Sequence, residues 1–79
     1  MSNSALILSV HDLAVEQRVL HYLLSKNSSA ARRVEIDVAE GEVTLRGQVK
    51  SFYTRQVFVQ GCRRVPGVTM VVDELRVEA

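Results

Sequence analysis

Two short stretches in which apolar and polar residues alternate, residues 34–38 and 43–49, constrain the fold of this chain more than any other feature. A period of two places one row of side chains in a core and the other in water, which is typical of a β-strand. Glu40 and Gly41 lie between the two stretches and predict a tight turn, because glycine adopts positive φ at little cost. The sequence therefore predicts an antiparallel hairpin with one dry face.

Helical periodicity flanks this hairpin on both sides. Apolar residues recur at spacings of three and four over residues 12–26, which predicts a helix with Asp12 as its N-cap and one stripe of leucines facing the sheet. Residues 51–65 predict a second helix, with Ser51 as its N-cap and Pro66-Gly67 ending it. The positions of the second helix expected to be buried are Thr54, Phe58, Cys62 and Val65.

The last element is a predicted third strand over residues 68–78. Its apolar alternation changes phase, which predicts a bulge or bend near residues 71–73. A chain of 79 residues holds one core. The order helix-strand-strand-helix-strand, with short connections, predicts an α+β fold whose two helices pack on one face of a three-stranded mixed sheet. We expect residues 1–11 to form a flexible or partly ordered leader and residues 12–79 a single domain.

Composition and motifs disfavour several function classes. The formal net charge of +1 is too small to indicate nucleic-acid binding, and the strands lack the interleaved aromatics that stack RNA bases. His11 and His21 lie about 15 Å apart along a helix axis, so they cannot share a metal ion within one chain. Cys62 is the only cysteine and is expected in the core. No nucleophile elbow or phosphate loop is present. The chain is therefore expected to be non-catalytic and to need no cofactor.

The apolar run at residues 5–8 does not indicate a membrane segment. It is far shorter than the roughly 20 residues of a span, and it lacks the positive flank and cleavage site of a signal peptide. The cellular location stays open at this point. A complete chain is expected in the cytoplasm, and a piece of a longer exported protein in the periplasm or envelope.

The residues around the predicted hairpin carry a resemblance to a known family. Residues 41–51 read GEVTLRGQVKS, which resembles the signature G-x-V-x-L-x-G-x-V and polar helix start of BON domains. Residues 65–77 are similar to the closing V-x-G-V-x-x-V-x-N-x-L-x-V of that family. BON domains occur in bacterial osmotic-shock and nodulation-related proteins, so the resemblance implies a bacterial stress-response setting. It also implies the element order given above, attachment to membranes or phospholipids or joining of larger assemblies, and no shared catalytic residues.

Three departures from the family pattern are visible. Phe58 stands where a small residue is usual and Gly61 where a large one is usual, an exchange that conserves volume and predicts local repacking. Asp73 stands where asparagine is common, so a bond donated by a side-chain amide is lost there. Family members usually belong to exported proteins, whereas no export signal is visible in this sequence.

Basic residues of the second helix are the candidate contacts with an anionic phospholipid surface. Each basic group near such a surface contributes about 1 kcal/mol. Arg32 and Arg33, which precede the first strand, could converge with them. The alternative is solvated charge and helix capping, since Glu35 and its neighbouring carboxylates dilute the positive field. The candidate contacts are Lys50, Tyr53, Arg55, Arg63 and Arg64.

Phe52 and Tyr53 also fit two interpretations. Aromatics beside cations suit a bilayer interface, but closure of one end of the core is the favoured interpretation, with Tyr53 the more exposed of the pair. Three glycines, Gly41, Gly47 and Gly67, are expected to be structural, serving the turn, a close helix–sheet approach and the helix end.

The alternative function is a protein-interaction or homo-oligomerisation module. The wet face of the hairpin mixes acidic, basic and neutral polar side chains, which suits protein contact more than bilayer burial. An open sheet edge or face would be the contact surface.

Overall fold

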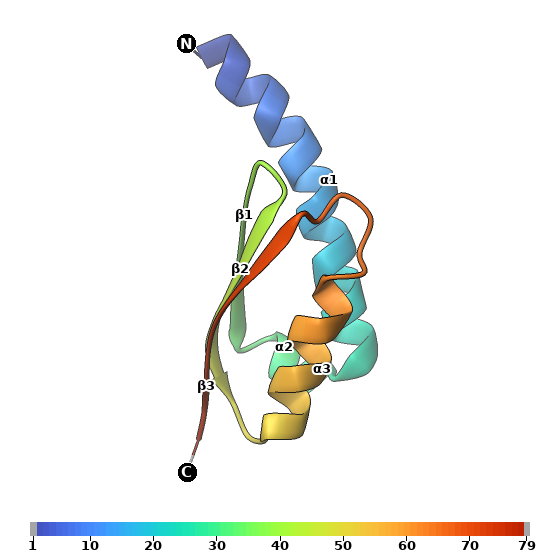
Figure 1. Ribbon diagram of the computed structural model, residues 1–79, viewed down its shortest axis with the longest axis vertical. Helices are drawn as coiled ribbons and strands as arrows, with labels where there is room; N and C mark the ends of the chain where they lie inside the picture. The colour runs from blue at the N-terminus through green and yellow to red at the C-terminus, as the bar shows by residue number, and fades with distance from the viewer. Residues whose placement is uncertain (1, 79) are drawn as a thin grey trace.

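The computed structural model describes the backbone of residues 2–78 and the side chains of residues 10–78. Met1 and Ala79, the two ends of the predicted leader and domain, lie outside the described residues. The elements are α1 (Ser2–Lys26), α2 (Ser28–Ala31), β1 (Val34–Ala39), β2 (Glu42–Val49), α3 (Phe52–Cys62) and β3 (Met70–Val77). The sheet order is β1-β2-β3, with β2 antiparallel to β1 and parallel to β3. Figure 1 shows α1 and α3 on one face of this sheet, which confirms the predicted α+β architecture.

The hairpin of β1 and β2 forms as predicted. Val38 pairs with Val43 across it, and the turn residues Glu40 and Gly41 have φ values of 52° and 83°. Positive φ at both central turn residues is the requirement of a type I′ turn, whose twist matches that of the strands. Asp12 of α1 also holds this turn, because its carboxylate accepts from the Glu40 N–H at 3.1 Å and from the Gly41 N–H at 3.4 Å.

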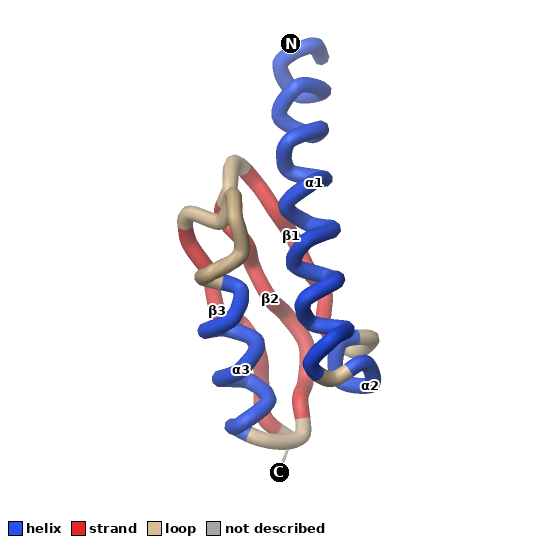
Figure 2. Tube along the Cα trace, turned by 90° about the vertical axis from the view of Figure 1, so that its right-hand side faces the viewer, coloured by secondary structure: helices blue, strands red, loops and turns tan. Residues whose placement is uncertain are grey.

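Helix α1 is longer than predicted. It begins at Ser2 and passes through Asp12, so the prediction of Asp12 as an N-cap is wrong. Its carboxylate serves the distant turn in place of its own helix end. Figures 1 and 2 show the first turns of α1 projecting beyond the sheet, past the β1–β2 turn. The division into a leader and a domain stays a prediction.

The row of α1 that faces the sheet is also different from the expected one. Val15, Val19 and Leu23 are fully buried, whereas Leu13 and Leu20 are 53% and 41% exposed. The expectation that a leucine stripe faces the sheet is therefore wrong for these two residues. Residues 12–26 carry two apolar rows, and only one face of a helix can lie on a sheet.

A short helix that the sequence did not predict follows α1. The side chain of Asn27 accepts from the Ala30 N–H at 3.1 Å and so begins α2. Ala31 at its end is 2% exposed and joins the core. Helix α2 turns the chain back into β1.

Strand β3 pairs with β2 without interruption. The register runs from Glu42 opposite Met70 to Val49 opposite Val77, so the predicted bulge is absent. The apparent change of phase arises because a carboxylate, Asp73, occupies the helix-facing row. That row comprises Val71, Asp73, Leu75 and Val77.

Helix α3 starts as the sequence indicates, but it ends at Cys62 and not at residue 65 as predicted. The hydroxyl of Ser51 accepts from the Thr54 N–H at 3.1 Å, which confirms the predicted N-cap. Phe58 and Cys62 are fully buried, while Thr54 is only half-buried because it lies in the capped first turn. The full core set is Val15, Val19, Leu23, Ala31, Val43, Leu45, Val49, Phe58, Val59, Cys62, Val65 and Leu75.

The exchange of size between positions 58 and 61 has a visible consequence. The Tyr22 ring of α1 lies against Gly61, where any Cβ would overlap it. The Tyr22 hydroxyl donates to the Val57 carbonyl at 3.2 Å. An aromatic side chain from α1 therefore fills the space over the glycine.

Candidate functional site

The end of the molecule where α3 begins exposes two aromatic side chains. The Ser51 cap fixes the first turn of α3, and Phe52 and Tyr53 of that turn are 71% and 77% exposed. Figures 1 and 2 place this turn at the opposite end from the N-terminus. The interpretation of the pair as a closure of the core is wrong, because Phe58 and Cys62 fill the inner face of α3.

Four basic residues lie at the same end as these aromatics. Lys26 ends α1, Arg32 and Arg33 follow α2, and Lys50 follows β2. A depression of about 200 Å³ has both Arg33 and Lys50 in its lining. We define the basic aromatic end as the set Lys26, Arg32, Arg33, Lys50, Phe52 and Tyr53.

Carboxylates are concentrated at the opposite end of the sheet. Asp37, Glu40 and Glu42 surround the β1–β2 turn, whereas the other ends of these strands lead to α2 and α3. Two carboxylates lie nearer the basic aromatic end instead. Glu35 is two residues after Arg33 at the start of β1, and Glu78 lies near Lys50 because its N–H donates to the Val49 carbonyl at 2.8 Å. The expected dilution of the positive field is therefore greater at the turn, while Glu35 and Glu78 are the carboxylates that dilute it near the basic aromatic end.

The five candidate contacts do not form one patch. Lys50 and Tyr53 lie together at the start of α3, but Arg63 and Arg64 follow its end. A helix of 11 residues separates these groups by about 16 Å. Arg55 is engaged elsewhere, since its Nε donates to Asp73 Oδ2 at 2.9 Å.

Sequence reasoning also missed part of this end. Lys26 belongs to the basic aromatic end only because α2 turns the chain back beside the end of α1. A helix as short as α2 has no periodicity that the sequence could reveal. The exposure of Phe52 could have been anticipated from Ser51, since a cap at that position places residue 52 outside the row of Phe58 and Cys62.

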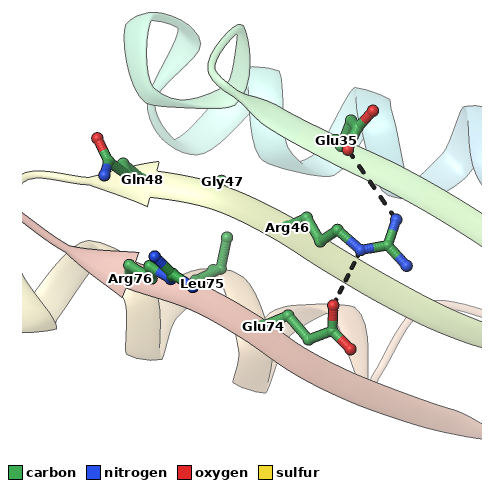
Figure 3. A pocket seen from close by; sticks show the side chains of 7 residues that line it. All are labelled: Glu35, Arg46, Gly47, Gln48, Glu74, Leu75 and Arg76. Atoms are coloured by element: carbon green, nitrogen blue, oxygen red, sulfur yellow. Dashed lines mark hydrogen bonds and ion pairs between the residues drawn. The ribbon is translucent and has the colours of Figure 1, made fainter.

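The face of the sheet away from the helices is polar. Figure 3 shows Arg46 of β2 between Glu35 of β1 and Glu74 of β3, with Glu74 Oε1 at 2.9 Å from Arg46 Nε and Glu35 Oε1 at 4.0 Å from Arg46 Nη1. The three side chains line a shallow depression on this face together with Gln48 and Arg76. Such exposed ion pairs contribute little to stability, so their importance is in the charge pattern they present.

Gly47 allows a close approach, although not to a helix as expected. Its φ is 134°, and a Cβ there would overlap the Arg33 carbonyl and lie 3.2 Å from Val34 Cα. The neighbour that approaches is therefore the start of β1. The other two glycines of interest, Gly41 and Gly67, have φ values of 83° and 94° in the turns at residues 40–41 and 66–67.

The described side chains include one cysteine, and it is buried. Burial raises the pKa of the Cys62 thiol to about 12, so the reactive thiolate is not formed near neutral pH. Among residues 10–78, no three His, Cys, Asp or Glu side chains lie close enough to hold a metal ion. No helix within residues 2–78 has the length and apolarity needed to cross a membrane.

Comparison with known proteins identifies the family. The family model of the BON domain matches residues 11–79, which covers the sheet, α2, α3 and most of α1. No curated protein was found to match the chain. Because the match spans nearly the whole sequence and the observed element order is the one that the resemblance implied, the chain belongs to the BON domain family, a family of binding modules.

Proposed function

We propose that this BON domain is a non-catalytic module that associates with anionic phospholipid surfaces through its basic aromatic end. The observation that carries the proposal is the exposure of Phe52 and Tyr53, 71% and 77%, beside Lys50. Aromatic rings of this kind sit at the headgroup level of a bilayer. Each adjacent lysine or arginine adds about 1 kcal/mol of attraction to an anionic leaflet.

The distribution of charge supports the same orientation. Although the net charge is only +1, the charges are separated along the molecule. Carboxylates surround the β1–β2 turn at one end, and the basic residues at the other end are Lys26, Arg32, Arg33 and Lys50. An anionic surface attracts the first end and repels the second, so the field orients the molecule before contact.

Co-sedimentation with vesicles tests the proposal. We expect binding to vesicles that contain phosphatidylglycerol and none to vesicles of phosphatidylcholine alone. Binding should fall between low and physiological salt, because added salt screens exposed charges. The variants Phe52→Ser/Tyr53→Ser and Arg33→Gln/Lys50→Gln should each weaken binding by about tenfold or more.

The matched control removes the same charge from elsewhere on the molecule. Arg63→Gln/Arg64→Gln loses two positive charges at the other end of α3 and should keep vesicle binding. Equal loss in this control would show that net charge and not the basic aromatic end determines binding. Failure of the wild-type protein to bind either kind of vesicle would refute the proposed membrane function of this domain.

The second candidate is a protein-interaction module that uses the open face of the sheet. The row Glu35-Arg46-Glu74 and Met70, which is 55% exposed opposite Glu42 at the other end of β3, present the mixture of charge and apolar surface found in protein interfaces. Arg46→Glu places three carboxylates in that row and separates the two candidates. Vesicle binding should survive this variant if the basic aromatic end is the membrane contact.

A further inference from the structure

The outer side of α1 carries an apolar row of which the protein's own core uses only the last member, Leu24. Val10, Leu13 and Leu20 are 71%, 53% and 41% exposed, and Leu24 is half-buried. Figure 2 shows this helix along its length, with its upper turns beyond the sheet. We define the outer stripe as Val10, Leu13, Gln17, Leu20 and Leu24.

The spacing of the outer stripe is that of a coiled-coil seam. Its members follow one another at intervals of three, four, three and four residues, a period of 3.5. In heptad notation Val10 occupies an a position, and Leu13 and Leu20 occupy d positions. Gln17 and Leu24 occupy the other a positions. Among parallel coiled coils, a β-branched residue such as valine at a with leucine at d favours two strands over three or four.

Gln17 also has a role in this seam. It is exposed and occupies the a position at the centre of the stripe. A single polar residue at a fixes the register of a pair of helices, because only the in-register arrangement lets the two amides bond to each other. An apolar face meant only for lipid has no need of such a residue.

The residues that flank the outer stripe can pair with the flanking residues of a second copy. Glu16 and His21 occupy the g and e positions on either side, and in a parallel pair the g residue of one helix lies beside the e residue five places on in the other. Glu16 therefore meets His21 of the second copy. The e and g positions from 14 to 23 hold no lysine or arginine, the residues that a lipid-facing helix would carry.

We infer that the outer stripe binds α1 of a second copy of this chain, parallel and in register, to form a weak symmetric dimer. The seam from Val10 to Leu24 is only about 21 Å long. Two such narrow faces bury less than the roughly 1,200 Å² of a standard stable interface, so the dimer forms only at high concentration. The helices need no ordering on association, because Val15, Val19 and Leu23 already hold α1 on the sheet.

Sedimentation velocity over a range of concentrations tests the dimer. The wild-type protein should move from monomer to dimer as concentration rises, and Leu13→Glu/Leu20→Glu should raise the dimer dissociation constant more than tenfold. Neither leucine belongs to the buried core, and they are 53% and 41% exposed, so the variant should keep its fold. The matched control Phe52→Glu/Tyr53→Glu introduces the same charges at the other exposed apolar site and should dimerise normally. A wild-type protein that stays monomeric throughout, or equal loss in both variants, overturns the inference.

Disulfide cross-linking tests the register. Val10→Cys and Gln17→Cys, each as a single variant, should form covalent dimers under mild oxidation, because each residue meets its own copy in a parallel pair. Cys62 is fully buried, so the wild-type protein should form none. Cross-linking of Gln17→Cys without Val10→Cys would show antiparallel crossing and contradict the parallel dimer.

Vesicle binding separates this inference from the proposed function. The dimer is supported if Leu13→Glu/Leu20→Glu loses self-association and keeps binding to phosphatidylglycerol vesicles. If the wild-type protein is monomeric and this variant loses vesicle binding, the outer stripe contacts lipid and the dimer is refuted.

Discussion

Arg55 Nε donates to Asp73 Oδ2 at 2.9 Å and so joins α3 to the edge strand β3. The other oxygen of the same carboxylate, Oδ1, accepts from the Leu75 N–H at 3.0 Å. Both side chains are partly sheltered, with 36% and 28% of their surfaces exposed. One acidic residue in the helix-facing row of β3 therefore holds both its own strand and the helix above it.

Asp73→Asn should lower the free energy of unfolding only slightly. The amide oxygen still accepts from the Leu75 N–H, and only the charge opposite Arg55 is lost, which for a partly exposed pair costs under about 1 kcal/mol. Asp73→Ala removes both bonds and should cost about 1–3 kcal/mol. Urea denaturation measures both variants. Equal losses would show that the ion pair, and not the bond to Leu75, is the stabilising contact.

Asp12→Ala should destabilise the hairpin turn. It removes the acceptor of the Glu40 and Gly41 N–H groups, at a cost of about 1–2 kcal/mol, and it should speed hydrogen exchange of these two amides. Asp12→Asn keeps one acceptor and should lie between the alanine variant and the wild type. The exposed neighbour His11→Ala is the control and should leave exchange at the turn unchanged. Unaltered exchange in Asp12→Ala would refute the role of this carboxylate.

Glu40→Asn should stabilise the protein by up to about 1 kcal/mol. Glu40 has a φ of 52°, a left-handed conformation that costs a β-carbon residue energy and that asparagine tolerates best. The donor to the Asp12 carboxylate is the backbone N–H of residue 40, so this bond persists in the variant. Glu42→Asn makes the same change of charge at the first residue of β2 and should not raise the free energy of unfolding. A rise in the denaturation midpoint for both variants would point to relief of acidic repulsion instead.

The parts of the fold that sequence predicted are those with local causes. The hairpin follows from alternation around Glu40-Gly41, and the start of α3 follows from the hydroxyl of Ser51. The bulge in β3 was mispredicted for a non-local reason. Asp73 is acceptable in a helix-facing row only because Arg55, 18 residues earlier, reaches it.

The candidate site was harder to predict because its composition depends on the packing of distant segments. Lys26 ends α1, Arg33 follows α2 and Lys50 follows β2, so packing of separate elements is needed to bring them to one end. The same limit applies to α1, whose two apolar rows have similar hydrophobicity. Which row meets the sheet is decided by tertiary contacts, so periodicity alone could not say that Leu23 is buried while Leu13 and Leu20 are exposed.

Gly61→Ala should destabilise the wild-type protein by about 1–3 kcal/mol, because the new methyl group overlaps the Tyr22 ring. In a Tyr22→Ala background the same substitution should become neutral or stabilising by up to about 1 kcal/mol, since alanine is the better helix former. The two measurements form a double-mutant cycle by chemical denaturation. Additive effects would contradict direct packing of Tyr22 on Gly61.

Cys62 should make stability depend on alkaline pH. Burial raises the pKa of its thiol from an ordinary 9.0 to about 12 in the folded state. Between these values the unfolded chain loses the thiol proton and the folded chain keeps it, so the free energy of unfolding falls as pH rises, by at most about 1.4 kcal/mol per pH unit. Below the lower value the thiol is neutral in both states and stability is independent of this group.

Comparison with Cys62→Ala isolates this contribution. The variant has a cavity and a lower free energy of unfolding overall, by about 1–2 kcal/mol, but it lacks the ionising thiol. The difference in unfolding free energy between wild type and variant should therefore shrink as pH rises above 9.0, because other titrating groups affect both proteins alike. A thiol reagent near neutral pH should likewise label Cys62 only as fast as the protein opens. A constant difference in unfolding free energy, together with rapid labelling of the native protein, would show that the thiol is accessible in the folded state.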